Sequence, residues 1–180
     1  KLPKETKEDF LNAIISIHEK KNNKYGFDFD TQIGGLKQIN KKSNNWVDFY
    51  RDYRLAYIYE LINKYEPMDL KINKKIELLL KKLGSFIPKN PSPSLLHGDL
   101  WEGNILFNDK KFAGFIDPGT FYGHNELEIA YLRWFNPDFI KKNFIEKYND
   151  IIPIDKEYYN YEPIYQLYYS LLNVYLWDRN

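Results

Sequence analysis

The stretch from residue 97 to residue 119 constrains the fold of this chain more than any other part of its sequence. Two short apolar runs, at residues 105–107 and 112–116, flank the turn-forming residues Asn108 to Lys110. This pattern predicts a β-hairpin. Polar residues crowd both open ends of the hairpin, with H-G-D-L-W-E-G-N before the first run and I-D-P-G at the end of the second. The chain must therefore support one short hairpin whose open ends are polar.

Apolar residues at helical spacing dominate the remainder of the chain. Thr6 and Asp9 resemble a capping box, which predicts a first helix from Thr6 to about Lys20. Further helices are expected over residues 46–61, before Pro67, and over residues 70–83, before Gly84. Residues 22–45 are expected to form a loop, because they are rich in Gly, Asn and Lys.

Helical patterns resume after the hairpin. One helix is expected from Asn125, which with Glu128 could form a cap. Asn136-Pro137-Asp138 is typical of an N-cap with proline at the first helical position, and a last helix is expected from about Pro163 to Trp177. The predicted fold class is α+β and mainly α. The Tyr-rich last helix is expected to pack in the core, because large apolar residues at helical spacing usually do.

Charge and residue usage exclude several classes of protein. Among 180 residues, 26 Lys and Arg nearly balance 25 Asp and Glu, so the net charge of +1 is too small for a nucleic-acid or membrane-surface binder. Cysteine is absent, which excludes disulfides, thiolate metal sites and a cysteine nucleophile. No apolar run is long enough to span a membrane, and no secretory signal is visible. We therefore expect a cytoplasmic protein.

Asp99 and Asn104 carry the strongest chemical signal. Four residues separate them, which is the spacing of the kinase catalytic loop. In that loop the Asp accepts the proton of the substrate hydroxyl, and the Asn holds Mg²⁺. An antiparallel hairpin returns its far end to its start, so Asp117 should lie beside Asn104 and complete the magnesium site. Asp and Asn are also common in turns, but three such residues in register with one hairpin favour a phosphotransferase.

The segment after Asp117 favours a small-molecule kinase over a protein kinase. The next helix is expected to start near Asn125, and the sequence has no A-P-E. The chain thus lacks the long activation segment of protein kinases. Pro118 stands where D-F-G has Phe, and its fixed φ argues against a phosphorylation-driven switch at this loop.

The sequence resembles the fructosamine kinase (ketosamine-3-kinase) family, a branch of the aminoglycoside phosphotransferase-like kinases. The resembling blocks are W-V-D-F-Y-R-D-Y-R-L (46–55), L-L-H-G-D-L-W-E-G-N (95–104), I-D-P-G-T-F-Y-G-H-N-E-L-E-I-A (116–130) and Y-Q-L-Y-Y-S-L-L-N (165–173). The resemblance implies a protein-kinase-like C-terminal lobe and ATP-dependent phosphorylation of the 3-hydroxyl of a ketosamine. The acceptor would be a small sugar-amine or a glycated protein lysine.

The resemblance also implies roles for individual residues. Asp99 would be the catalytic base, while Asn104 and Asp117 would be the Mg²⁺ ligands. Leu106 and Ile116 would form a floor under the adenine of ATP.

Several neighbouring positions have weaker assignments. Trp101 could stack on the sugar ring, with core packing as the alternative. His97 is expected to support the catalytic loop by hydrogen bonding. Arg54 and Glu128 match family positions and could pair across helices or lie on a solvated face, and we assign no role to His124. Gly119 and residues 133–136 depart from the usual family residues, which puts the outer wall of the sugar pocket in doubt.

Kinases also need a glycine-rich strand pair, a Lys that grips the phosphates and a Glu partner for that Lys. None is visible in residues 1–180. We therefore expect residues 1–180 to form a C-terminal catalytic-loop and substrate lobe without the N-terminal ATP-clamping lobe, and this segment alone to be inactive. An aminoglycoside or choline kinase and a non-catalytic pseudokinase-like lobe are the alternatives. The oligomeric state is not predicted by the sequence.

Overall fold

The computed structural model describes residues 3–135 and 140–177. The elements of its first half run in this order: α1 (Lys4–His18), β1 (Thr31–Ile33), β2 (Leu36–Gln38), α2 (Trp46–Tyr50), a π-helical turn (Arg51–Leu55), α3 (Ala56–Tyr65), α4 (Leu70–Lys82) and a 3₁₀ turn (Leu83–Ser85). The second half contains β3 (Ser94–Leu96), a 3₁₀ turn (Glu102–Asn104), β4 (Ile105–Asn108), β5 (Lys111–Phe115), β6 (Phe121–Gly123), α5 (Asn125–Phe135), α6 (Lys142–Asn149) and α7 (Tyr158–Trp177). The architecture is α+β and mainly α, as expected.

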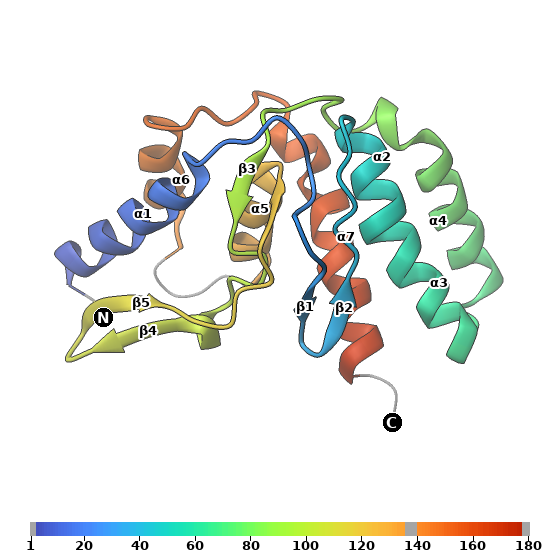
Figure 1. The fold of residues 1–180 in the computed structure, drawn as a ribbon, viewed down its shortest axis with the longest axis horizontal. Coiled ribbons are helices and arrows are strands. Elements are labelled where there is room, and N and C mark those ends of the chain that lie inside the picture. The colour runs from blue at the N-terminus through green and yellow to red at the C-terminus, as the bar shows by residue number, and fades with distance from the viewer. Residues whose placement is uncertain (1–2, 136–139, 178–180) are drawn as a thin grey trace.

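The predicted hairpin is confirmed as the antiparallel pair β4–β5. Asn108 pairs with Lys111, so Asp109 and Lys110 form a two-residue turn, with φ of 47° and 64°. A positive φ at both central positions is the geometry of a type I′ turn, which matches the twist of the strands. Helix α1 lies along the hairpin (Figure 1). Its Phe10 ring packs edge-on against Phe112 and Phe115 of β5.

Two further antiparallel pairs, β1–β2 and β3–β6, are short. The pair β3–β6 joins the segment before the predicted catalytic loop (residues 97–104) to the segment after Asp117, with Leu96 opposite Phe121. The pair β1–β2 falls within residues 22–45, so the expectation of a plain loop there was wrong. In Figure 1 the β1–β2 hairpin lies in front of α7. Its Gln38 contacts the Gly119 carbonyl, in the segment that follows Asp117.

The core is built around α7, which packs along α5 and α3. The Tyr131 and Tyr169 rings stack with centroids 3.8 Å apart and planes 5° from parallel. Trp46 is fully buried, and its Nε1 donates a hydrogen bond to the Tyr165 hydroxyl at 2.8 Å. Most tyrosines of α7 are buried, which confirms that this helix belongs to the core.

The helix starts differ from expectation at both ends of the chain. Helix α1 begins at Lys4, and no side chain caps it. Thr6 is not a cap, because it lies inside the helix and its hydroxyl donates to the Lys110 carbonyl at 2.5 Å. Helix α7 begins at Tyr158, so Pro163 lies inside it and not at its start. The expected N-cap at 136–138 lies outside the described residues.

Arg54 does not pair with Glu128, and it does not lie on a solvated face. It is fully buried, and its guanidinium donates to the Ile39 carbonyl and to the Asn40 amide oxygen at 2.9 and 2.8 Å. It also lies over the Phe121 ring at 4.0 Å. These contacts tie the π-helical turn to the segment that follows β2 and to β6.

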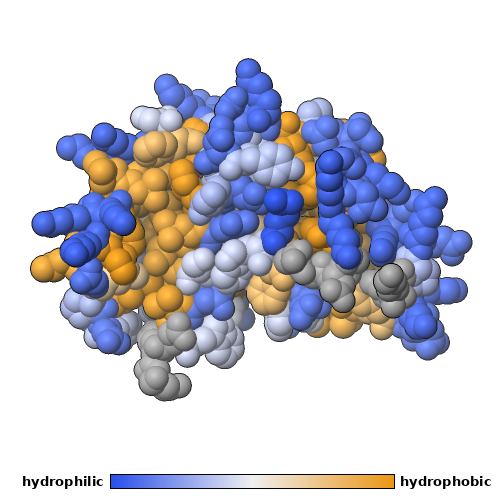
Figure 2. Space-filling model, turned by 180° about the vertical axis from the view of Figure 1, so that it is seen from behind, coloured by the Kyte–Doolittle hydropathy of each residue, from blue (hydrophilic) through white to orange (hydrophobic). Residues whose placement is uncertain are grey.

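Apolar side chains also reach the surface. Figure 2 shows them gathered on the back of the molecule over the half that carries α4. A groove between α4 and α7 is lined there by Met68, Ile72, Ile76, Leu79, Leu167, Leu171 and Val174, with the stem of Lys75. Across residues 3–135 and 140–177, no helix is both long and apolar enough to cross a membrane. The cytoplasmic location stays a prediction.

Candidate active site

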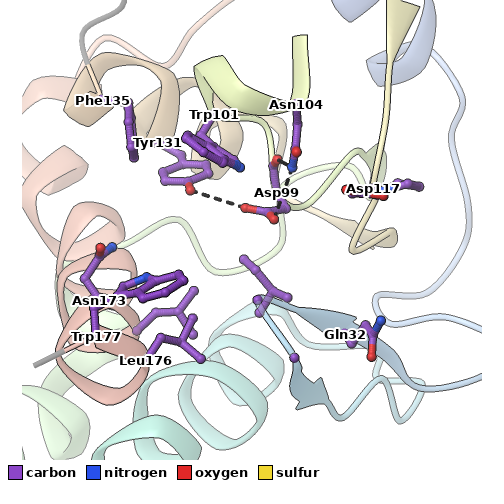
Figure 3. A pocket seen from close by; sticks show the side chains of 15 residues that line it. Gln32, Asp99, Trp101, Asn104, Asp117, Tyr131, Phe135, Asn173, Leu176 and Trp177 are labelled. Atoms are coloured by element: carbon purple, nitrogen blue, oxygen red, sulfur yellow. Dashed lines mark hydrogen bonds between the residues drawn. The ribbon is translucent and has the colours of Figure 1, made fainter. Parts of the chain in front are cut away.

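Asp99 lies in the loop between β3 and the 3₁₀ turn at Glu102–Asn104, and both of its carboxylate oxygens are held. The Tyr131 hydroxyl donates to Oδ1 at 3.3 Å, and the Asn104 amide donates to Oδ2 at 3.2 Å. Figure 3 shows both contacts at the edge of a cavity. Burial raises the pKa of Asp99, while the hydrogen bonds from Tyr131 and Asn104 act in the opposite direction. The carboxylate is thus fixed in orientation and more basic than an ordinary Asp.

Gly98 lets the catalytic loop pass against the segment after Asp117. Its φ is +87°, and a Cβ at this position would lie 2.1 Å from the Gly119 carbonyl oxygen. That carbonyl also accepts a hydrogen bond from the Gln38 amide at 3.0 Å, so it is not free to move away. The three segments that carry Asp99, Asp117 and the β1–β2 hairpin therefore meet at the Gly98–Gly119 contact.

We predict that Gly98→Ala lowers the free energy of unfolding by more than the backbone strain of about 1–3 kcal/mol that an L-residue pays at positive φ. Gly35→Ala is the matched control, because Gly35 has a φ of +82° but a Cβ at this position would meet nothing within 4 Å. Urea unfolding of both variants measures the difference, which isolates the contact with Gly119. Equal losses in the two variants would show that this contact is not tight.

Glu128, on α5, holds the backbone of the catalytic loop. Its Oε1 accepts from the Gly98 N–H at 2.6 Å, and its Oε2 accepts from the His97 N–H at 3.1 Å. His18 Nε2 lies 2.9 Å from the same Oε2, and the His18 Nδ1 lies 2.7 Å from the Tyr148 hydroxyl. Burial opposes ionisation of Glu128, but the hydrogen bonds from His18 and the backbone together have the larger effect, so the pKa of Glu128 is lowered. A buried carboxylate thus fixes the loop that carries Asp99.

His97 contacts this loop from within. Its Nδ1 accepts a hydrogen bond from the Asp99 N–H at 3.4 Å, and its ring packs edge-on against Phe115. The His97 Nε2 is buried and has no hydrogen-bond partner among the described residues. These contacts are consistent with a residue that shapes the loop, and the supporting role of His97 stays a prediction.

Asn104 and Asp117 lie at the open end of the β4–β5 hairpin and line the same cavity as Asp99. The Ile116 N–H donates to the Asn104 carbonyl at 3.1 Å, which joins the two ends of the hairpin. Asp117 has a φ of 52°, and its carboxylate makes no hydrogen bond or ion pair with the described part of the chain. The structure therefore brings together the three polar residues that the sequence predicted.

This donor set fits Mg²⁺. The Asn104 amide nitrogen faces Asp99 and donates to its carbonyl at 2.8 Å, which leaves Oδ1 available as an oxygen ligand. With the unpaired Asp117 carboxylate it supplies hard oxygen donors of the kind Mg²⁺ prefers, and water and phosphate oxygens usually complete its shell. No group of three or more His, Cys, Asp or Glu residues forms a separate metal site within residues 3–135 and 140–177. When bound here, Mg²⁺ would neutralise phosphate charge.

The cavity has a volume of about 720 Å³ and walls from four parts of the fold. Besides the three polar residues, its walls comprise Gln32, Ile33, Gly34 and Gly35 of the β1–β2 hairpin, Trp101 and Pro118, Tyr131 and Phe135 of α5, and Leu172, Asn173, Leu176 and Trp177 of α7. Figure 3 shows Trp101, Tyr131 and Phe135 on one side of Asp99 and Asp117 on the other. The cavity is thus aromatic on one side and polar on the other.

Trp101 lies in the cavity wall and not in the core. It is 36% exposed, and its ring centroid lies 5.5 Å from that of Phe135. The indole folds over Gly103, where a Cβ would lie 2.3 Å from Cη2. Gly103 therefore permits this orientation of Trp101, and the alternative of core packing was wrong.

Leu106 and Ile116 are 43% and 38% exposed, and neither is among the described residues that line the cavity. Both keep apolar surface on or beside the hairpin. An apolar surface adjoining the metal site is what a floor under adenine requires, and that role stays a prediction.

Sequence reasoning missed Tyr131 and the cavity residues of β1–β2, whereas Phe135 lies within residues 133–136, which it had related to the outer wall of the sugar pocket. Asn173 lies in the family-like block at residues 165–173, so this block could have indicated that α7 forms part of the cavity wall. Nothing local marked Tyr131, which lies 32 positions from Asp99.

His124 has a structural place outside the cavity. It is buried, and its Nδ1 lies 2.8 Å from the Tyr165 hydroxyl. Burial lowers its pKa to about 3, so the ring is neutral near pH 7.

The family model for fructosamine kinase matches residues 2–179 of this chain. The chain belongs to the fructosamine kinase family. A protein of Enterococcus faecium classed as a ketoamine kinase is 32% identical over 167 residues, which cover 92% of this chain and 60% of that protein. Mouse ketosamine-3-kinase is 33% identical over 147 residues, which cover 82% of this chain and 47% of the mouse protein.

A solved structure confirms the fold class. The crystal structure of a Haemophilus somnus protein classed with the fructosamine-3-kinases superposes with a TM-score of 0.85 at 29% identity, covering all of this chain and 60% of that one. The fold is therefore α+β and protein-kinase-like, as the resemblance implied. This fructosamine kinase family chain spans about half to three fifths of the length of these relatives.

Proposed function

We propose that the full-length protein transfers the terminal phosphoryl group of ATP to a sugar hydroxyl of a ketosamine. Asp99 accepts the proton of that hydroxyl, whose oxygen bonds to the phosphorus while the bond to the ADP oxygen breaks. Asn104 and Asp117 would hold Mg²⁺ against the phosphates, and Leu106 and Ile116 would lie under the adenine. Positioning and charge stabilisation dominate phosphoryl transfer, so three side chains fixed by one hairpin suit the reaction.

One observation carries this proposal. The orientation of the Asp99 carboxylate is fixed by hydrogen bonds to both oxygens, and it opens into the same cavity as Asn104 and Asp117. A base and two metal ligands around one cavity form the minimal site for transfer of a phosphoryl group to a bound hydroxyl. Membership of the fructosamine kinase family supports the same reaction.

The cavity supports a sugar-amine as the acceptor. Its volume of about 720 Å³ lies within the range of small-molecule sites, roughly 300–1,000 Å³. Trp101 would offer its exposed indole face to the C–H groups of the sugar. Mouse ketosamine-3-kinase bears a name that points to the same class of substrate. The acceptor would be a small sugar-amine or the sugar of a glycated protein lysine.

The nucleotide clamp would come from outside residues 1–180. Apart from Asp99 and Asp117, the described residues that line the cavity are uncharged, so no Lys reaches the phosphate position from them. We propose that residues 1–180 form the C-terminal lobe and that an N-terminal lobe of the full-length protein clamps ATP. The 180-residue segment alone should bind ATP weakly and show no turnover.

A substrate panel tests the function. The full-length protein is incubated with ATP, Mg²⁺ and a set of ketosamines, aminoglycosides and choline, and ADP release is measured. We expect ADP release with ketosamines near neutral pH. Turnover with aminoglycosides or choline alone would reassign the acceptor, and no turnover with any acceptor would favour a non-catalytic lobe.

Asp117→Asn tests the metal site. Asn keeps the size of the side chain and tolerates positive φ, but it removes the anionic ligand. We expect the Mg²⁺ concentration for half-maximal rate to rise by at least about tenfold, equivalent to 1.4 kcal/mol. Asp109→Asn is the matched control, because Asp109 also has a positive φ, of 47°, at the far end of the same hairpin. An equal Mg²⁺ requirement in both variants would remove Asp117 from the site.

A further inference from the structure

Tyr131 places its phenol hydroxyl beside Asp99, the proposed base. Its O–H donates to Asp99 Oδ1 at 3.3 Å, and the residue lines the same cavity. Burial, and then the neighbouring Asp99 charge, raises the pKa of Tyr131 well above its usual value. The phenol therefore keeps its proton and stays a donor to Asp99.

The position of this hydroxyl is fixed by packing. The Tyr131 ring stacks on Tyr169 with centroids 3.8 Å apart, and Phe135 packs edge-on at 5.9 Å and 89°. Tyr131 is only 5% exposed. A ring held on two sides cannot turn its hydroxyl away from Asp99 without disturbing the contact between α5 and α7.

The Tyr131 oxygen retains acceptor capacity. A phenol has one donor and accepting lone pairs, and the only hydrogen bond of this hydroxyl within the described residues is the one to Asp99. Neighbouring hydroxyl oxygens of a sugar are separated by roughly the length of one hydrogen bond, about 3 Å. When one sugar hydroxyl faces Asp99 Oδ1, its neighbour therefore comes within reach of the Tyr131 oxygen.

We propose that Tyr131 determines specificity by accepting a hydrogen bond from the acceptor hydroxyl next to the one that is phosphorylated. The acceptor of this site is thus a vicinal diol, with Asp99 facing the reacting hydroxyl and Tyr131 facing the next. In a ketosamine phosphorylated at its 3-hydroxyl, the neighbour is the hydroxyl at C4. This inference rests on the proposed function and extends it to the acceptor.

The test is a cycle of two enzymes and two substrates. The kcat/KM values of the full-length protein and of Tyr131→Phe are measured with one ketosamine and with its 4-deoxy analogue. In the wild type we expect the analogue to react about tenfold less well, equivalent to 1.4 kcal/mol. In Tyr131→Phe we expect kcat/KM for the parent ketosamine to fall about tenfold, and kcat/KM for the 4-deoxy analogue to equal that for the parent. A merely structural role of Tyr131 would lower kcat/KM for both substrates by the same factor. The ratio of the two kcat/KM values would then be the same as in the wild type.

Tyr59→Phe is the matched control. Its hydroxyl also donates to a carboxylate at 3.3 Å, from α3 to Glu77 of α4, but it lies on the surface and outside the cavity. We expect this variant to keep the wild-type ratio between the two substrates.

The outcomes separate the two proposals. An unchanged ratio in Tyr131→Phe, with the parent ketosamine still phosphorylated by the wild type, would overturn the role of Tyr131 and leave the function standing. If the wild type neither phosphorylates the parent ketosamine nor binds it in a calorimetric titration, the function fails, and the role of Tyr131 fails with it.

Discussion

Asp99→Asn in the full-length protein is expected to lower kcat for ketosamine phosphorylation by about 10²- to 10⁴-fold, the usual contribution of a positioned general base. The variant keeps the size of the side chain and an oxygen that can accept from Tyr131, which donates to Asp99 Oδ1 in the native site. It removes the carboxylate that takes the proton and also the Oδ2 acceptor of the Asn104 amide, which keeps its hydrogen bond to the Asp99 carbonyl. The loss should therefore appear in kcat, while KM for the ketosamine changes little.

Steady-state kinetics with saturating ATP and Mg²⁺ measures this loss, and urea unfolding checks that the variant is folded. Asp109→Asn supplies the control, since it makes the same chemical change in the turn of the hairpin, away from the cavity. Wild-type kcat in Asp99→Asn would exclude Asp99 as the base. An equal loss in Asp109→Asn would show that the hairpin as a whole, and not one carboxylate, had been damaged.

The positions of the proposed metal ligands could be predicted because local sequence determines them. Asn104 and Asp117 are joined by a hairpin whose turn forms within residues 108–111. Once the turn is set, antiparallel pairing brings the strand ends together, whatever the rest of the chain does. Spacing along the sequence was therefore sufficient to place Asn104 beside Asp117.

The remainder of the cavity depends on long-range packing. The β1–β2 hairpin has only three residues in each strand, and its Gln38 is held by the Gly119 carbonyl. Such short strands carry little periodic signal, so their Gly- and Lys-rich sequence favoured a loop. Tyr131 reaches Asp99 only because α5 packs on α7, which no local pattern reports.

Arg54 shows why the pairing of charged residues was mispredicted. Two opposite charges at family-like positions suggested an ion pair with Glu128, but each found nearer partners. The two terminal amino groups of the Arg54 guanidinium donate to the Ile39 carbonyl and the Asn40 side chain, while Glu128 binds His18 and the loop backbone. Buried polar groups take whatever hydrogen-bonding partners the packing supplies, and backbone groups leave no signature in a sequence.

Glu128→Ala is expected to lower the free energy of unfolding at neutral pH by about 3–5 kcal/mol, because each buried polar group left without its partner costs roughly 1–3 kcal/mol. The substitution would leave His18 and the N–H groups of His97 and Gly98 without their acceptor. Glu146→Ala, which breaks an exposed i,i+4 pair with Lys142 at 3.6 Å, is the control and should cost under about 1 kcal/mol. Urea unfolding of the 180-residue chain measures both losses.

The pH dependence gives a sharper test of Glu128. Its pKa in the folded chain lies below the ordinary value of 4.5, so its ionised form stabilises the fold above pH 4.5. That contribution is lost as the pH falls from 4.5 through the lowered pKa, because the carboxylate becomes protonated. The difference in unfolding free energy between wild type and Glu128→Ala should therefore shrink on acidification. A difference that stayed constant from neutral pH to below the lowered pKa would mean that the Glu128 charge does not hold the catalytic loop. The loss of unfolding free energy would then come only from the packing that is lost when the side chain is truncated.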